Sequence, residues 1–279
     1  PAMDLDMYKH PSTLDSFHKL KSFGNLIIPA ESGELASGLS GEGRMAEPEN
    51  IVAFLEKDLL EKLPLKGKKI LITAGPTYEA IDPVRFVGNH SSGKMGFDIA
   101  NEAANKGAEV ILVSGPTHLN VQNSSIKLIR VTSAQDMYDA CHEHYEKVDV
   151  AIAAAAVADY RPKNVANQKI KKNEVTFSIE LEKTKDILAS LGEQKKNQFL
   201  IGFALETENE IEHAKQKIQK KNLDLIVLNS LNDKGAGFGL PTNKVTFISK
   251  DFIVEPKELK TKEEVAQDII NKVIQFYDA

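Results

Sequence analysis

The chain has 279 residues, of which 42% are hydrophobic and 27% are charged, and its formal net charge is −5 at pH 7. This length supports a large core in one or two domains, and the composition is that of an ordinary soluble globular protein. The negative charge argues against nucleic-acid binding, and no apolar run reaches the roughly eighteen residues of a membrane span. The single cysteine, Cys141, excludes an internal disulfide framework and is typical of the cytoplasm.

The first 50 residues do not show the pattern of a domain. We expect a short helix near residues 13–22 and a strand at residues 26–28. Residues 33–43 are rich in glycine, which predicts a long loop. A helix with one apolar face is expected at residues 47–62, followed by a linker at residues 63–67.

From residue 68 onwards, strand-like and helix-like segments alternate. The apolar strand runs are short and continuous, which is typical of parallel strands covered on both faces. The predicted strands span residues 69–73, 109–113, 127–131, 148–154, 199–203 and 225–228, and the predicted helices span 92–106, 133–146, 184–191 and 208–221. An antiparallel pair is expected at 244–249 and 251–254, and a final helix at 261–276. The sequence therefore predicts an α/β fold, a doubly wound, mostly parallel, Rossmann-like sheet with a small antiparallel addition.

A glycine-rich loop at residues 85–96 lies between the first strand and the first helix of this pattern. A helix start presents free backbone N–H groups and the positive end of the helix dipole, and both attract phosphate. Hydroxyls and a cation add to this, so the predicted phosphate-binding loop is Ser91, Ser92, Gly93 and Lys94. The alternative is a well-capped helix that binds nothing. A P-loop is rejected, because Met95 stands where the Mg²⁺-binding hydroxyl is required.

Ligands of doubly wound sheets lie beyond the carboxyl ends of the strands, and two such ends carry unusual residues here. Small side chains end the strand at 148–154 and would let a flat heterocycle approach the backbone. Asp159 follows them and suits a ribose hydroxyl or a metal ion, although a surface aspartate is the alternative. Phe203 ends another strand, where it either stacks on a base or packs in the core.

Lysines are concentrated in three further places. Residues 169–172 contain three lysines, residues 183–186 lead into a helix, and Lys217 and Lys221 share a helix face. Each set either faces an anionic ligand, where an ammonium stabilises negative charge, or faces water. No His/Cys cluster has zinc-ligand spacing.

Taken together, these loops resemble phosphopantothenoylcysteine synthetase, the ligase of coenzyme A biosynthesis, over essentially all of residues 66–279. The matching segments, in the family's order, are ILITAGPTYEAIDPVRFVGNHSSGKMG, LVSGPT, AAVADYRP, KIKK, GFALET and KKNLDLIVLN. The resemblance implies a synthetase domain at residues 66–279.

The first 50 residues resemble the tail of the flavin-dependent phosphopantothenoylcysteine decarboxylase, which bacteria often fuse ahead of the synthetase. Residues 1–65 are therefore expected to be a C-terminal remnant of that domain plus a linker. Asp4 replaces the family's asparagine in the PAMD motif, and Ser37 stands where many members carry a catalytic cysteine. We expect no decarboxylation and no bound FMN from this chain alone.

The resemblance implies a two-step ligation of 4′-phosphopantothenate to L-cysteine. The carboxylate of phosphopantothenate attacks the α-phosphate of CTP, giving an acyl-cytidylate and pyrophosphate, and the amine of cysteine then displaces CMP. The resemblance also implies Mg²⁺, bound mainly through the nucleotide phosphates, and a cytoplasmic homodimer formed through the synthetase domain. Cations and oriented N–H donors are what such a reaction between two anions requires.

Position by position, the resemblance also implies residue roles. Asn89 handles the intermediate, Lys169 is required for catalysis, and Arg85 binds phosphopantothenate in a neighbouring subunit's site. Lys185 departs from the proline that usually heads its segment. The implied nucleotide-binding set is Ala153, Ala154, Ala155, Asp159, Lys169, Lys185, Asp186, Ile187, Leu188, Phe203, Lys217 and Lys221.

Two rival functions differ from the ligase in class. A nicotinamide-dependent dehydrogenase is disfavoured, because G-x-G-x-x-G is missing from the first strand–helix turn. A non-enzymatic nucleotide-binding module would bind CTP but would release no pyrophosphate. The choice between CTP and ATP rests on backbone geometry that the sequence does not show.

Overall fold

The structure, a computed structural model, describes residues 2–35, 37–171, 177–230 and 239–278. The chain divides into two compact units, Pro1–Leu63 and Pro64–Ala279. The described elements of the first unit are α1 (Leu5–Lys9), α2 (Pro11–Ser22), β1 (Glu31–Glu34), β2 (Ser40–Arg44) and α3 (Pro48–Glu61). The helices predicted at residues 13–22 and 47–62 are confirmed as α2 and α3, and each begins with a proline, whose missing N–H costs nothing in a first turn.

The glycine-rich segment 33–43 is not the long loop that its composition predicts, because β1 and β2 pair antiparallel within it. A Cβ on Gly43 would lie 2.3 Å from the carbonyl oxygen of Met3, and the Met3 N–H donates to the Gly43 carbonyl at 2.8 Å. Glycine therefore permits close backbone approach here. The strand predicted at residues 26–28 is also wrong: the segment is irregular, and Leu26 is 58% exposed.

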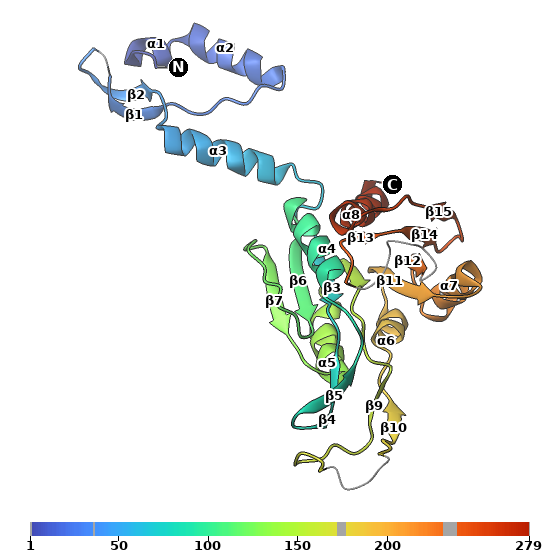
Figure 1. Cartoon of the computed structure of the whole chain (residues 1–279). Helices are drawn as coiled ribbons and strands as arrows, with labels where there is room; N and C mark the ends of the chain where they lie inside the picture. Colours follow the sequence, from blue (N-terminus) through green and yellow to red (C-terminus); the bar gives the residue numbers. More distant parts are fainter. Residues whose placement is uncertain (1, 36, 172–176, 231–238, 279) are drawn as a thin grey trace. The chain divides into compact units, whose positions relative to one another are not determined.

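The second unit is built on an eight-stranded sheet with the order β15-β14-β12-β11-β8-β3-β6-β7 (Figure 1). Strands β3, β6, β7, β8, β11 and β12 are parallel, whereas β14 and β15 run antiparallel to their neighbours. The predicted mostly parallel sheet with an antiparallel addition is confirmed. The bounds are β3 (Lys69–Ala74), β6 (Glu109–Ser114), β7 (Ile126–Arg130), β8 (Val150–Ala153), β11 (Phe199–Glu206), β12 (Leu225–Ser230), β14 (Val245–Ser249) and β15 (Val254–Pro256).

Helices cover both faces of this sheet, as a doubly wound fold requires. One apolar cluster joins alternate strand residues to α4 (Lys94–Asn105) and α8 (Lys262–Asp278). The cluster on the other face joins the remaining strand residues to α5 (Ala134–Tyr145), α6 (Ile187–Gln194) and α7 (Glu210–Lys220). None of the helices in the described ranges is long and apolar enough to cross a membrane.

Cys141 lies in the second of these clusters, on α5, and is fully buried. Burial raises the pKa of its thiol to about 12. The residue therefore belongs to the core, as its place in a helical segment predicts, and at neutral pH it is a protonated thiol.

Leu65 shows that the stretch 63–67 is more than a linker. Its side chain is fully buried in the cluster of α4 and α8, and its N–H donates to the carbonyl of Lys106 at 2.9 Å. Leu65, an apolar residue in an otherwise turn-like segment, is thus part of the core beside the end of α4.

Short antiparallel pairs project from the sheet at its loops. They are β4 (Tyr78–Asp82) with β5 (Arg85–Gly88), β9 (Tyr160–Pro162) with β10 (Leu181–Lys183), and β13 (Thr242–Asn243) with β16 (Lys260–Thr261). Residues 85–88, predicted as loop, are therefore strand. The buried Asp82 side chain accepts hydrogen bonds from the N–H groups of Val84 and Arg85, at 2.9 and 3.0 Å, and so fixes the turn of this hairpin.

The strand order creates a crevice at the centre of the sheet. From β3 the chain moves outwards to β6 and β7, then returns to add β8, β11 and β12 on the opposite side of β3. β3 and β8 are therefore neighbours whose following loops diverge, which is the switch point where doubly wound sheets bind ligands.

Candidate functional site

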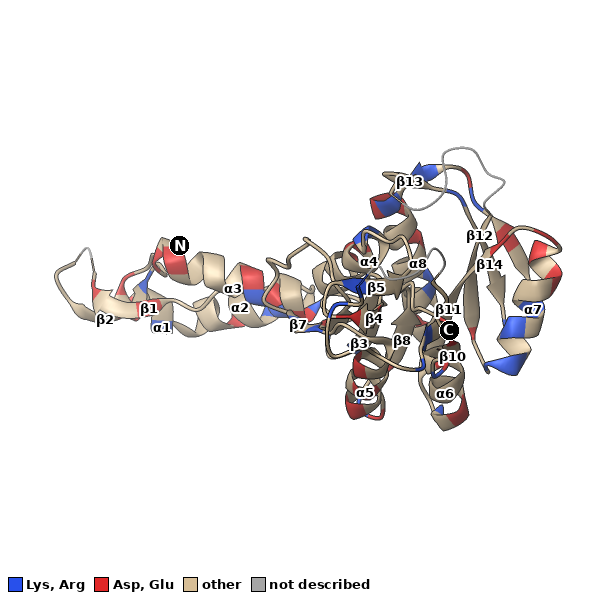
Figure 2. Ribbon diagram, turned by 60° about the horizontal axis from the view of Figure 1, so that its bottom comes forward, with Lys and Arg blue, Asp and Glu red and all other residues tan. Residues whose placement is uncertain are grey.

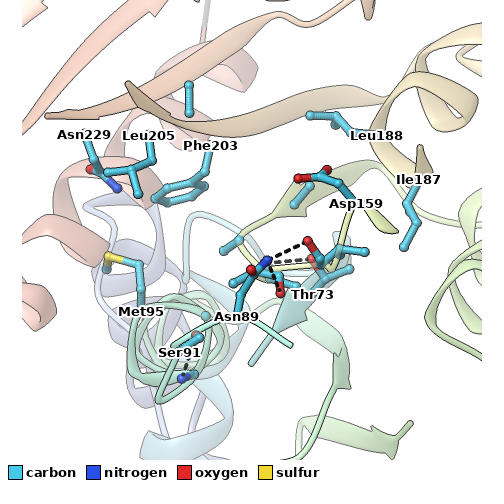
Figure 3. Close-up of a pocket in the computed structure, with 18 of the residues that line it drawn as sticks. Thr73, Asn89, Ser91, Met95, Asp159, Ile187, Leu188, Phe203, Leu205 and Asn229 are labelled. Carbon is cyan, nitrogen blue, oxygen red and sulfur yellow. Dashed lines mark hydrogen bonds between the residues drawn. The ribbon is translucent and has the colours of Figure 1, made fainter. Parts of the chain in front are cut away.

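A pocket with a volume of about 750 Å³ lies at the carboxyl ends of β3, β8 and β11 (Figure 3). Its described lining contains six lysines but two aspartates, so its charge favours anionic ligands. The residues of the lining that the sequence singled out are Asn89, Ser91, Ser92, Gly93, Lys94, Ala153, Ala154, Ala155, Asp159, Lys185, Asp186, Ile187, Leu188, Phe203, Lys217 and Lys221.

The floor of the pocket is the segment that follows β8, where small side chains leave the backbone accessible. Side-chain oxygens and a carbonyl of the β3 loop hold this segment in place. The N–H of Ala155 donates to Thr73 Oγ1 at 3.1 Å, and that of Ala156 donates to the Gly75 carbonyl at 2.9 Å. Because these residues are half-buried and line the pocket, a flat ring can lie against backbone that is already fixed.

Asn89 lies in the middle of the pocket, just after β5. Its Nδ2 donates to the carbonyl oxygen of Val157 at 2.9 Å and lies 3.4 Å from that of Ala156. Figure 3 shows Asn89 between two ends, one with Asp159, Ile187 and Leu188 and the other with Met95, Leu205 and Asn229. The side-chain amide of Asn89 is therefore hydrogen-bonded to the floor of the pocket between its two ends.

The start of α4 forms one wall. Gly93 is its N-cap residue with a left-handed φ of 80° and no side-chain cap bond of its own, and Ser92 Oγ accepts from the Lys94 N–H at 3.4 Å. Ser91 Oγ accepts from the Gly93 N–H at 3.3 Å. A Cβ on Gly96 would lie 2.6 Å from the Cβ of Ala74. Glycine at this position therefore lets the helix start approach β3 closely.

The lysine of this loop is neutralised by carboxylates. Lys94 Nζ lies 2.9 Å from Asp98 in its own helix and 2.8 Å from Glu263 at the start of α8. Although burial lowers the pKa of Lys94, its hydrogen bonds to Glu263 and Asp98 raise that pKa overall. The Lys94 ammonium group therefore lines the pocket while it forms ion pairs with Asp98 and Glu263.

The two lysines of α7 are also paired. Lys217 Nζ lies 2.5 Å from Glu206 at the end of β11, and Lys221 Nζ lies 2.9 Å from Asp186, the N-cap of α6. Burial raises the pKa of Asp186, but its bonds from Lys221 and the Ala189 N–H outweigh this and lower it. Figure 2 shows the acidic start and the basic end of α7, an order that matches the helix dipole.

A family model described as the DNA/pantothenate metabolism flavoprotein C-terminal domain matches residues 65–277, the unit that contains this pocket. The chain belongs to this family. It is 45% identical, over 275 residues, to the coenzyme A biosynthesis bifunctional protein CoaBC of Bacillus subtilis, covering 98% of this chain and 68% of that protein. The resemblance to the synthetase part of the bacterial bifunctional protein is thereby confirmed.

Other relatives and structures agree on the family or the fold. A protein of an unknown prokaryotic organism, named cysteine/cysteine sulfinic acid decarboxylase, is 52% identical and covers 98% of this chain and 78% of its own length. The crystal structure of the C-terminal domain of a CoaBC protein is 49% identical, with a TM-score of 0.66, and covers 78% of this chain and 99% of its own. A Cab2 variant in complex with phosphopantothenate-cysteine, 17% identical with a TM-score of 0.59 over 81% of this chain and 94% of its own, shares the fold.

Two residues to which the synthetase resemblance gives roles lie outside the lining that the structure describes. The Arg85 guanidinium binds the buried Asp82 carboxylate and donates to the carbonyl of Ile170 at 3.2 Å. Lys169 is exposed and immediately precedes Ile170. These contacts hold the two predicted residues together beside the β4–β5 hairpin, rather than in the pocket of their own chain.

Sequence reasoning also missed residues that line the pocket. Asn229 follows the apolar run of β12, which was a signal for a strand-end ligand residue. Lys262 and Asn243 offered no such signal, since they come from α8 and from β13, a two-residue strand. The other members missed are Thr73, Met95, Gly96, Ala156, Val157, Tyr160, Ala204, Leu205 and Gly239. Lys183 and Thr184, which belong to the segment 183–186 that the sequence singled out, also line the pocket.

A protein-based metal centre has no candidate in the described part of the chain, where no group of three or more His, Cys, Asp or Glu residues could hold an ion. The carboxylates of the described pocket lining are Asp159 and Asp186. Such a pair fits an ion that arrives with most of its ligands from phosphate oxygens and water.

Proposed function

We propose that this protein is a ligase that joins 4′-phosphopantothenate to L-cysteine, with CTP as the energy source. The observation that carries the proposal is the pocket at the switch point, in which Asn89 lies between two ends and, in the described lining, lysines outnumber aspartates. An enzyme that brings two polyanions together needs this excess of positive charge. The similarity to CoaBC proteins, named for coenzyme A biosynthesis, supports the same assignment.

The nucleotide is assigned to the end that contains Asp159. Backbone groups of residues 153–155 would read the edge of the base, and Asp159 would accept from a ribose hydroxyl. Lys217 and Lys221 would bind the phosphates. Because each already has a carboxylate partner, the phosphates would share or displace Glu206 and Asp186. Lys185, Ile187, Leu188 and Phe203 complete the proposed nucleotide site.

In the first step, a carboxylate oxygen of phosphopantothenate attacks the α-phosphorus of CTP. The bond from that phosphorus to the pyrophosphate oxygen breaks, which leaves an acyl-cytidylate and pyrophosphate. The proposed role of Lys169 is to stabilise the negative charge that develops here. Since Lys169 lies next to Ile170, which Arg85 contacts, and outside the described lining of its own chain's pocket, it would act in the pocket of a second copy, as proposed below for Arg85. Mg²⁺, held mainly by the nucleotide phosphates with Asp159 or Asp186 within reach of the same end, would neutralise part of the triphosphate charge.

In the second step, the neutral amine of cysteine attacks the acyl carbon, the bond to the CMP oxygen breaks, and the amine loses a proton as the amide forms. Asn89 lies where the two ends of the pocket meet, so we assign it the positioning of the acyl-cytidylate for this attack. Fixed donors of this kind contribute through orientation and charge stabilisation.

We assign Arg85 to the pocket of a second copy of the chain. The β4–β5 hairpin and the β9–β10 arm, which lie on the same side of the sheet (Figure 1), expose large apolar side chains. Exposed apolar surface of this extent is typical of subunit interfaces. The exposed residues are Val84, Phe86, Tyr160, Val165, Phe177 and Leu181, with exposed fractions of 44–59%.

Pyrophosphate release tests the proposal. The protein is given phosphopantothenate with each of the four nucleoside triphosphates, with and without cysteine, and Mg²⁺ is present. The expected result is pyrophosphate with CTP and phosphopantothenate, and phosphopantothenoylcysteine with CMP when cysteine is added. CTP binding without pyrophosphate would establish a binding module, and NADH binding would establish the dehydrogenase. Carbon dioxide released from cysteine would support the activity named in the decarboxylase relative.

A further inference from the structure

Lys262 is a buried cation in the pocket wall that comes from the far end of the sequence. It is the first residue of α8, its side chain is 6% exposed, and it lines the pocket that contains the start of α4. Its backbone N–H donates to the Pro241 carbonyl at 3.0 Å, which anchors the helix start. The backbone from which the Lys262 side chain extends is thus fixed by secondary structure.

Two asparagines that contact each other belong to the lining of the same pocket. Pairing of β13 with β16 sets Asn243 opposite Lys260, and Asn243 is 4% exposed. Its Nδ2 donates to Asn229 Oδ1 at 3.2 Å, and both asparagines line the pocket. Amide groups and an ammonium in the lining of one pocket are suited to an oxygen-rich group of a ligand.

The pKa of Lys262 is shifted in the opposite direction from that of Lys94. Burial lowers the pKa of Lys262, and the nearby Lys94 adds to this effect, against the attraction of Asp98. The pKa of Lys94 is instead raised overall by its two carboxylate partners. The surroundings of the two lysines therefore shift their pKa values in opposite directions.

We propose that Lys262 binds the phosphate group of a substrate at the start of α4, where Ser91–Gly96 and Lys262 line the same pocket. The inference rests on the proposed ligase function and adds to it the residue that supplies the cation. The phosphate belongs either to phosphopantothenate or to the nucleotide, and the two substrates are distinguished by their separate KM values.

The test compares Lys262→Met with Lys272→Met. Lys272 lies on the same helix, where it pairs with Glu255 at 2.6 Å outside the pocket. The loss of a charge-assisted hydrogen bond to phosphate predicts a rise of roughly 10- to 100-fold in the KM of one substrate for Lys262→Met. Isothermal titration calorimetry with that substrate alone should show the same loss of affinity. Lys272→Met should keep the KM values of the unaltered protein.

Lys262→Arg supplies a second measurement that a purely structural role would not change. Among the described residues, the charges of Lys94 and Asp98 on α4 act on the pKa of Lys262. With lysine, the KM of the phosphate-bearing substrate should rise at alkaline pH, before an ordinary lysine would lose its proton. Arginine keeps its charge throughout this range, so Lys262→Arg should abolish the rise while retaining much of the affinity.

Unchanged KM values in a folded Lys262→Met protein would overturn the assignment, and so would equal losses in Lys262→Met and Lys272→Met. The unaltered protein separates this outcome from a failure of the ligase proposal. If that protein releases pyrophosphate and Lys262→Met behaves like it, only the role of Lys262 is wrong. If the unaltered protein releases none, the ligase itself is wrong.

Discussion

At the scale of one residue, Asn89 is proposed to position the acyl-cytidylate formed in the first step for the second step. Its amide donates to the Val157 carbonyl, and an aspartate in its place would set a carboxylate against carbonyl oxygens and anionic substrates. We expect Asn89→Asp to form the acyl-cytidylate but to lose amide formation by on the order of 100-fold or more. Rates of pyrophosphate and CMP release, measured on the same sample, separate the two steps.

The matched control is Asn123→Asp. Asn123 lies in a loop, and its Oδ1 accepts from the Ser125 N–H at 2.9 Å, a bond that aspartate can also make. The control should therefore retain both rates. Normal amide formation by Asn89→Asp would remove this residue from the proposed second step.

Asp82 gives a prediction that depends on pH. The hydrogen bond from Arg85 holds the pKa of this carboxylate well below its usual range, and bonds from Val84 and Ile170 add to this against the effect of burial. The ionised group thus stabilises the fold above about pH 4, the ordinary aspartate pKa, and this stabilisation is lost as the pH falls into the acid range. We expect Asp82→Asn to lower Tm by a few degrees at pH 7 and by progressively less below pH 4.

Thermal unfolding followed by circular dichroism across this pH range tests the prediction. The unaltered protein and the variant should converge in acid. A Tm difference that stays constant from pH 7 to pH 3 would show that the carboxylate charge contributes nothing. Activity should fall as well, because Asp82 also accepts from the Ile170 N–H at 3.1 Å, next to Lys169.

At the scale of elements, the contact between α4 and β3 depends on the absence of one side chain. A Cβ at Gly96 would overlap with Ala74, so Gly96→Ala should force the helix start away from the sheet. We expect a destabilisation of about 1–3 kcal/mol, together with a raised KM for the substrate bound at this helix start. Urea unfolding measures the first effect. Asn101→Ala, an exposed change in the same helix, should cause neither effect.

Sequence patterns predicted the parallel strands and helices because each carries its own periodicity. The short β4–β5 and β9–β10 pairs could not be predicted in this way, since polar contacts, some of them over long sequence separations, stabilise them rather than an apolar pattern. Asp82 binds both Arg85 and the Ile170 N–H, and Arg161 pairs with Glu182 across β9 and β10.

The same distinction applies to the pocket. Residues of glycine-rich loops and strand ends were predicted, because such loops are where this fold binds ligands. Lys262 was missed, since no local pattern indicates that the first residue of a helix, 168 positions after Lys94, reaches the same pocket. The ion pairs of Lys94, Lys217 and Lys221 also depend on tertiary structure.

At the scale of the whole molecule, the proposed second copy leads to a test of Arg85. If Arg85 acts in the neighbouring pocket, mixing Arg85→Ala with Asn89→Asp should restore activity that neither variant has alone. Each mixed dimer would contain one pocket with Asn89 from one chain and Arg85 from the other. Random pairing would give about a quarter of normal turnover, because half the dimers are mixed and each has one intact pocket.

Formation of phosphopantothenoylcysteine after co-refolding at equal concentrations measures this recovery, because Asn89→Asp alone is still expected to release pyrophosphate. Size-exclusion chromatography reports the dimer. Co-refolding each variant with itself is the control. No recovery from a dimeric mixture would assign Arg85 to its own chain's pocket, and a monomer at working concentrations would remove the shared site altogether.

The burial of Cys141 protects the enzyme from the oxidised form of cysteine, the substrate that we propose for it. An accessible thiolate would exchange with cystine, the oxidised form of free cysteine, and become blocked as a mixed disulfide. A protonated thiol that is buried between the sheet and the helices on one of its faces cannot exchange with cystine while the fold is intact. Iodoacetamide should therefore leave the native protein unlabelled and active, and alkylation should appear only after denaturant has opened the core.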